Sequence, residues 1–139
     1  MKARRVEGLA PGEALRPNAA RIVRTRLGEL RGFADEALTP DAVAAQHDMR
    51  IAAKRLRYAL EIFAPCLGAE AAVARRAAKQ LQSALGDLRD CDIMLPRSER
   101  IPSLAVALRA RRERLFHDFV ALWRTEAGRG TWAALERSL

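Results

Sequence analysis

Aromatic residues are scarce in this sequence and make up 5% of the 139-residue chain. Segments that alternate apolar and polar residues are also missing, so no stretch requires a β-strand. Half of the residues are hydrophobic, and many of these are alanine and leucine, which favour helices. The composition therefore predicts an all-α protein. It also lacks the spaced aromatic side chains on which single-stranded nucleic acids stack.

Cysteine and histidine are limited to two residues each. Cys66 and Cys91 do not form a C-x-x-C pair, and two thiols make no zinc site by themselves, so they indicate a reducing compartment. No run of 18 apolar residues occurs, and residues 1–5 are not followed by the apolar core of a secretory signal. We therefore expect a soluble, cytoplasmic protein with no membrane segment, no metal and no cofactor.

Acidic residues are outnumbered by basic ones, 17 to 25, which gives a formal net charge of +8. This balance favours anionic partners such as nucleic acid, phosphate polymers or an acidic membrane surface. Only three of the basic residues are lysine, and the planar arginine side chain can contact two phosphate oxygens at once. A GC-rich genome, which raises arginine and alanine together, is the alternative explanation for this bias.

The spacing of apolar residues predicts four long helices and a short fifth one. An irregular lead-in of residues 1–17 precedes the first helix, for which Asn18 is the expected N-cap. The second helix is expected to begin at Thr39-Pro40-Asp41, which combines a capping hydroxyl, a proline and an acid, and to end near Ala64. We expect the other helices over residues 69–91 and 104–124, with Thr131 capping the last.

The connections between these helices are short, which makes neighbouring helices antiparallel. We therefore predict a single domain over residues 18–139, an antiparallel four-helix bundle with a short C-terminal helix. The apolar residues expected on the inner face of the fourth helix are Leu104, Leu108, Leu115, Phe119 and Leu122.

A basic stripe lies on the expected second helix. At 100° per residue, His47, Arg50, Lys54 and Arg57 fall within roughly an 80° arc. Only two acidic residues occur between positions 47 and 61, so these charges are largely uncompensated. The pattern favours a helix that binds a polyanion, with a solvated basic surface as the alternative. A separate apolar stripe contains Met49, Ala53, Leu56, Leu60 and Phe63.

A second polar stripe on the expected third helix contains a glycine at mid-helix. Gly86 costs the helix about 1 kcal/mol relative to alanine, which favours a close approach of another helix or of a ligand, although simple tolerance remains open. Arg24 and Arg31 flank the apolar face of the expected first helix. The other members of the stripe on the third helix are Arg75, Lys79, Gln82 and Arg89.

Two motifs resemble the signature of the CHAD family, the conserved-histidine α-helical domains. The first is His47-x-x-Arg50-x-x-x-Lys54-Arg55-Leu56-Arg57-Tyr58, followed by Phe63. The second is Lys79-x-Leu81-Gln82-x-x-Leu85-Gly86-x-x-x-Asp90-x-Asp92. The flanks at both ends also look like those of the family, so the resemblance covers nearly the whole chain.

The resemblance implies a helical bundle that binds inorganic polyphosphate through a basic channel and is often associated with polyphosphate granules. The residues at the binding positions of the motifs are His47, Arg50, Lys54, Arg55 and Arg57 on the second helix and Lys79 on the third. We add four arginines as further phosphate contacts, and two aspartates that we expect to orient Arg or Lys side chains of neighbouring helices. The arginines are Arg24, Arg31, Arg89 and Arg112, and the aspartates are Asp90 and Asp92.

Members of the family usually contain two such bundles, whereas this chain has one histidine-bearing helix of this kind. Either one bundle suffices for binding, or two copies pair as a homodimer that rebuilds a two-bundle channel.

Three other functions stay open on the sequence. A nucleic-acid-binding helical bundle would use the same charge, although we expect nucleic acid only as a non-specific competitor. A metal-dependent phosphohydrolase would use His47, Asp48 and the two aspartates, but a metal needs further ligands and His117 is the only other histidine. A basic scaffold for protein partners is the third. No nucleophile–base pair or phosphate-binding loop is visible, so we expect binding and not catalysis.

Overall fold

Five α-helices and two short 3₁₀ segments make up the computed structural model, which describes all residues from 1 to 139 and contains no strand. The all-α prediction is therefore confirmed. The 3₁₀ segments, Ala64–Cys66 and Leu95–Ser98, each contain a proline in their first turn and form the turns that follow α2 and α3. The helices are α1 (Leu15–Ala37), α2 (Val43–Ile62), α3 (Ala69–Met94), α4 (Pro102–Gly128) and α5 (Thr131–Ser138).

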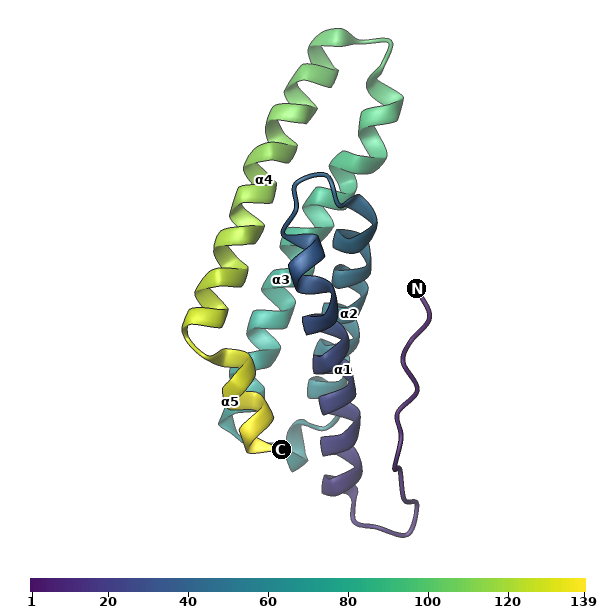
Figure 1. Ribbon diagram of the computed structural model, residues 1–139, viewed down its shortest axis with the longest axis vertical. Coiled ribbons are helices and arrows are strands. Elements are labelled where there is room, and N and C mark those ends of the chain that lie inside the picture. The colour runs from purple at the N-terminus through teal and green to yellow at the C-terminus, as the bar shows by residue number, and fades with distance from the viewer.

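The bundle is built around α3, which packs against α2, α4 and α5 (Figure 1). Helices α1, α2 and α3 run antiparallel to their neighbours and form one compact part, and α5 closes its lower end. Helix α4 returns along α3, and the hairpin formed by these two helices extends beyond the upper ends of α1 and α2 (Figure 1). None of the helices has both the length and the hydropathy that crossing a membrane requires.

Leucine and alanine fill the core. Leu56 and Leu60 of α2 and Leu81 and Leu85 of α3 are fully buried, and most of the other buried positions of these helices are alanine. The apolar stripe expected on α2 is buried from Met49 to Leu60. Because alanine side chains are short, helices that pack through them approach closely. The buried alanines of α2 and α3 include Ala52, Ala53, Ala59, Ala71, Ala74, Ala77 and Ala78.

The inner face expected on α4 is only partly realised. Phe119 is buried, but Leu104 is exposed and Leu108 is only half-buried. The reason is the length of the α3–α4 hairpin, whose upper part has no cover from α1 or α2 (Figure 1).

Three predicted helix starts are wrong, and in each case a side chain near the expected start makes a contact other than the expected cap. Helix α1 begins at Leu15, and Asn18, inside it, pairs with both the N–H (2.9 Å) and the C=O (2.8 Å) of Ala10. Helix α2 begins at Val43 because residues 39–42 form a turn, which the Gln46 amide holds by donating to loop carbonyls. Before α5, Gly130 (φ +69°) is the N-cap, and the Thr131 hydroxyl donates to Glu126 (2.5 Å).

The lead-in before α1, residues 1–14, is irregular as expected, but it is docked along α1 (Figure 1). Its main anchor is Glu29, a carboxylate with a side chain only 1% exposed. Glu29 accepts hydrogen bonds from the backbone N–H of Arg4 (2.5 Å) and from the Arg26 guanidinium (3.0 Å). A buried carboxylate with these two donors holds the lead-in against the helix.

We predict that Glu29→Ala detaches the lead-in. The substitution leaves the Arg4 N–H and the Arg26 guanidinium without their acceptor at a buried site, which lowers the free energy of unfolding by about 1–3 kcal/mol. Limited proteolysis should show faster cleavage within residues 1–14. The matched control is Glu13→Ala, which removes an exposed ion pair with Arg21 and should change the unfolding free energy by less than about 1 kcal/mol. Equal cleavage of wild type and Glu29→Ala would contradict this role.

Candidate functional site

The polar stripes of α2 and α3 line one open groove of about 520 Å³. The stripes meet there because the apolar faces of the two helices pack against each other, which leaves the adjacent polar stripes side by side. Ile93 is the single apolar residue among those lining the groove. The lining residues are His47, Arg50 and Arg57 from α2 and Lys79, Gln82, Ser83, Gly86, Asp87, Arg89, Asp90 and Ile93 from α3.

Four buried polar atoms at this groove have no hydrogen-bond partner. They are Nδ1 of His47, the Nε atoms of Arg50 and Arg57, and Oε1 of Gln82. Polar atoms removed from water without a partner destabilise a protein, and most buried polar atoms in folded proteins are paired. The acidic residue within 4 Å of Arg57 is Glu61, whose Oε1 lies 3.6 Å from Nε without making a hydrogen bond. Hydrogen-bonding groups beside the cations of this groove are therefore left unsatisfied by the protein itself.

The charge of the groove is predominantly positive. Arg50, Arg57, Lys79 and Arg89 line it, and none of them forms an ion pair within hydrogen-bonding distance. Two carboxylates, Asp87 and Asp90, lie on the exposed side of α3 and pair with no basic side chain within 4 Å.

The imidazole of His47 reflects this environment. Burial lowers its pKa below the ordinary value of 6.5, and the positive charges of Arg89 and Arg50 lower it further, against the opposing effect of Asp48. The groove therefore holds a neutral imidazole at neutral pH, which can donate a hydrogen bond without adding to the crowding of cations.

Tyr58 orders two cations at the edge of the groove. The Arg57 guanidinium carbon lies 4.7 Å from the centre of the tyrosine ring, and the Lys54 ammonium lies 5.6 Å from it. Both are cation–π distances, so the ring offsets part of the repulsion between the two charges. Lys54 itself is exposed and lies outside the groove lining.

Other predicted binding residues lie away from the groove. Arg55 turns toward the lead-in, where it donates to the Met1 carbonyl (3.1 Å) and lies 3.9 Å from Glu29. On α1, Arg31 pairs with Glu136 of α5 (2.8 Å). This hydrogen bond lowers the pKa of the Glu136 carboxyl, and the positive charge of Arg24 lowers it further. The predicted binding residues therefore lie on at least three surfaces: the groove, the side of α2 that contacts the lead-in, and the side of α1 that contacts α5.

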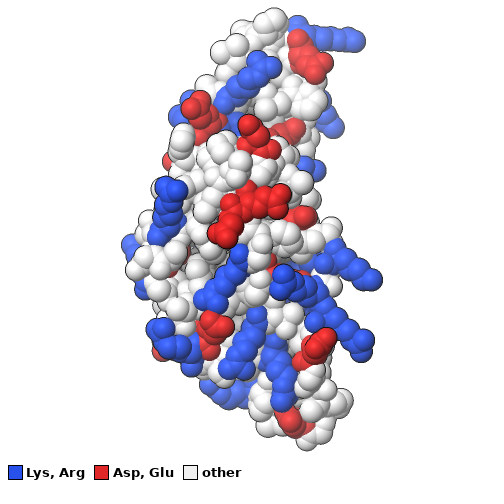
Figure 2. Space-filling view, in the orientation of Figure 1, with Lys and Arg blue, Asp and Glu red and all other residues white.

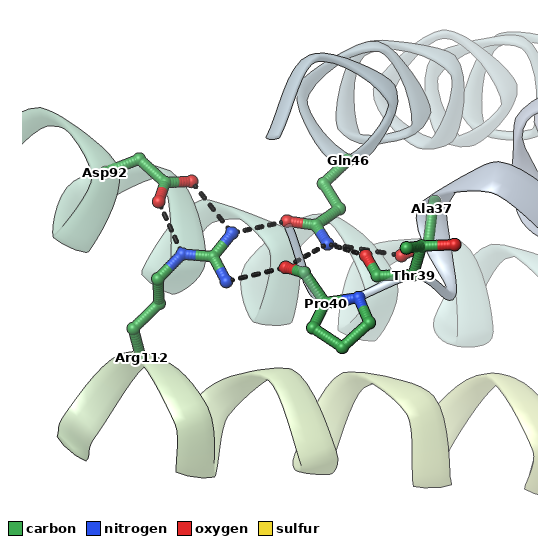
Figure 3. A network of polar contacts seen from close by, with 6 residues as sticks. All are labelled: Ala37, Thr39, Pro40, Gln46, Asp92 and Arg112. Carbon is green, nitrogen blue, oxygen red and sulfur yellow. Dashed lines mark hydrogen bonds and ion pairs between the residues drawn. The ribbon is translucent and has the colours of Figure 1, made fainter. Parts of the chain in front are cut away.

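Arg112 connects three helices through hydrogen bonds and does not line the groove. Its Nε donates to Asp92 of α3 (2.5 Å), and its two terminal nitrogens donate to Gln46 of α2 (2.7 Å) and to the Pro40 carbonyl (2.9 Å) (Figure 3). Only 13% of the side chain is exposed. Protein acceptors occupy this guanidinium, and Arg112 lies outside the groove that contains several of the other expected phosphate contacts. Asp92 thus orients a basic side chain of a neighbouring helix as the sequence predicts, whereas Asp90 has no basic side chain within 4 Å.

The two histidines do not share a site. His117 borders a different cavity, of about 630 Å³, beside Arg112 and Asp92. No three side chains of His, Cys, Asp or Glu come together as they would around a metal ion.

Positive charge is not limited to the groove. Figure 2 shows basic side chains gathered over the lower half of the visible face, where Figure 1 places α1, α5 and the end of α4. Acidic side chains form a group near the middle of that face (Figure 2). A polyanion that binds through charge alone therefore has more than one surface available.

A family model described as the CHAD domain matches residues 3–99. The chain belongs to the CHAD domain family. The matched region contains the lead-in, α1, α2, α3 and therefore both walls of the groove, whereas α4 and α5 follow it. CHAD domains are associated with polyphosphate binding. No curated protein and no solved structure gives a match to this chain.

We predict that the stability of this CHAD domain depends on the neutral state of His47. Because the folded state lowers the pKa of His47, the unfolded chain binds the proton more readily, and the free energy of unfolding falls as the pH decreases through about 6.5. Urea denaturation at pH 7.5 and 5.5 measures the change, and His47→Gln should reduce it. His117→Gln, at the exposed histidine, is the control and should keep the wild-type dependence. The same pH dependence in His47→Gln as in wild type would refute the assignment.

Proposed function

We propose that this protein binds inorganic polyphosphate in the groove between α2 and α3. The observation that carries the proposal is a groove lined by four cations, none of which forms an ion pair within hydrogen-bonding distance. Arginine and lysine side chains are hydrogen-bond donors, and phosphate oxygens are charged acceptors, so the cations that line the groove suit a phosphate polymer. The association of CHAD domains with polyphosphate selects this ligand among polyanions.

The groove suits a linear polymer. Arg50 and Arg57 lie seven residues apart on α2 and Lys79 and Arg89 ten apart on α3, so the cations extend over about 10 Å of one wall and about 15 Å of the other. Polyphosphate carries about one negative charge per phosphate, and each neutralised charge releases a bound counterion, which makes binding salt-dependent.

The proposed contacts are fewer than those expected from the sequence. Arg50, Arg57, Lys79 and Arg89 contribute charge, and His47 contributes a hydrogen bond. Lys54 adds charge at the edge, through its position beside Tyr58. The guanidinium groups of Arg24, Arg31, Arg55 and Arg112 are outside the proposed site.

The proposal is one of binding and not of catalysis. It includes a cytoplasmic location with association to polyphosphate granules, and nucleic acid as a non-specific competitor. The proposal also includes a homodimer, in which two copies would bring two grooves together into one larger site.

We predict that Arg57→Ala combined with Lys79→Ala weakens polyphosphate binding at least about tenfold, because it removes one cation from each wall. Titration of long-chain polyphosphate at several salt concentrations should also show a slope of log affinity against log salt that is smaller by roughly 1.5. The melting temperature should change little, since neither side chain makes a strong ion pair.

The matched control is Arg24→Ala combined with Arg109→Ala, which removes the same charge from two exposed positions outside the groove. Its affinity should stay close to that of wild type. Equal losses in the two double variants would overturn the groove assignment and favour binding by overall charge. Displacement of polyphosphate by duplex DNA at matched charge concentration would favour a nucleic-acid-binding function instead.

A further inference from the structure

His47 is the residue through which the groove can change its charge near neutral pH. Histidine is the side chain whose ordinary pKa, 6.5, falls between pH 5 and 8, and His47 is the one histidine that lines the groove. Arg50 lies one helical turn further along α2, and Arg89 lines the facing wall. Protonation of His47 would therefore add a fifth cation to the four that already line the groove.

The surroundings of His47 oppose that protonation while the groove holds no ligand. Burial is the largest cause that lowers the pKa of His47, and the charges around the ring act mainly in the same direction. These charges belong to Arg89 of α3, Asp48 and Arg50 of α2, and the amino group of Met1 in the lead-in. No charged group of α1, which also packs against α2, is among them. Asp48 alone favours the charged ring, so the balance keeps the imidazole neutral.

The protein also provides no acceptor for a second ring proton. Nδ1 of His47 is buried and makes no hydrogen bond, and no carboxylate oxygen lies within 4 Å of the ring nitrogens. Asp87 and Asp90 line the groove from α3, but they occupy exposed positions where water and salt screen their charge. An imidazolium has two N–H donors and a positive charge, so it needs a negative partner that only a ligand can bring.

A polyanion in the groove reverses the balance of charge at the ring. Because His47, Arg50 and Arg89 line the same groove, phosphates that neutralise the two arginines also lie near the imidazole. Negative charge at that distance favours the imidazolium, so a bound polyanion raises the pKa of His47. Linkage is reciprocal: the factor by which the ligand strengthens proton binding is also the factor by which protonation strengthens ligand binding.

We propose that the groove binds polyphosphate together with a proton, which His47 takes up, so that the affinity for polyphosphate increases as the pH falls. This inference rests on the proposed function of the groove. The bond that forms is the second N–H bond of the imidazole, and the buffer acid supplies the proton. Affinity is constant well above pH 7, rises as the pH falls through the interval between the bound-state and free-state pKa values, and levels off below the free-state value.

Calorimetric titration of the protein with long-chain polyphosphate measures both consequences. At pH 6.5, the heat of binding in two buffers of different ionisation enthalpy should differ by the amount that corresponds to uptake of a fraction of one proton per protein. At constant salt, the affinity should be about tenfold higher at pH 5.5 than at pH 8, which corresponds to a difference of about one unit between the two pKa values. Long chains are the probe because their terminal phosphates, which titrate near pH 6, are a small share of the polymer.

Two histidine variants assign the proton. His47→Gln replaces the imidazole by a polar side chain that does not titrate, so the proton uptake and the ratio of affinities between pH 5.5 and pH 8 should both lose most of their wild-type size. His117→Gln is the matched control, because it removes the exposed histidine of α4, which lies outside the groove. Its proton uptake and its ratio of affinities should equal those of wild type.

The outcomes distinguish the two proposals. Wild type that fails to bind polyphosphate at any pH overturns the proposed function. Wild type that binds with the same heat in both buffers, and with the same affinity at pH 5.5 and pH 8, overturns the proton coupling alone. Proton uptake that persists in full in His47→Gln also overturns it, because another group of the protein or the ligand would then take up the proton.

Discussion

The packing of α2 on α3 is the interaction on which the fold and the groove both depend. Burial of the leucines and alanines of these helices drives the association, since removing apolar surface from water is the main favourable contribution to folding. The same packing brings Arg50 and Arg57 of one helix beside Lys79 and Arg89 of the other. These four positive charges repel one another, and the burial of the core has to offset that repulsion. A rotation of either helix about its axis would move the charges apart. Rotation is prevented because it would expose Leu56 and Leu85, both of which are fully buried.

The arginines of this chain have different functions according to the acceptors that they meet. Arg112 meets Asp92, Gln46 and a backbone carbonyl, so it fixes the relative positions of three helices (Figure 3). Arg26 meets the buried Glu29 and helps to hold the lead-in. Arg50 meets no acceptor at Nε and lines the groove. Residue type is the same in these cases, and what differs is whether the fold brings an acceptor within reach of the guanidinium.

This difference explains how far the sequence predicts the structure. Periodicity depends only on the geometry of one helix, so it identified the buried stripe of α2 and the basic stripe beside it. Which neighbour a stripe faces depends on contacts between distant segments. Arg24 and Arg31 looked equivalent to the groove residues for that reason, although Arg31 pairs with α5. The helix starts failed for a related reason. Asn18 and Thr39 are good capping residues in isolation, but Asn18 pairs with Ala10, and Gln46 makes the chain turn after Thr39.

Helix α4 follows the region that matches the family model, yet it is connected to the groove through α3. Asp92, which pairs with Arg112 on the side of α3 facing α4, lies between two groove residues, Asp90 and Ile93, on the same helical turn. The ion pair therefore holds the end of α3 where one wall of the groove finishes. An unpaired Asp92 or Arg112 at this half-buried site would be costly, so the two side chains keep α3 and α4 together. A wall that carries unpaired cations needs this support, because its own charges favour separation from α2. The bundle thus places its paired arginine on one side of α3 and its unpaired cations on the other, and only the second side can gain stability from a polyanion.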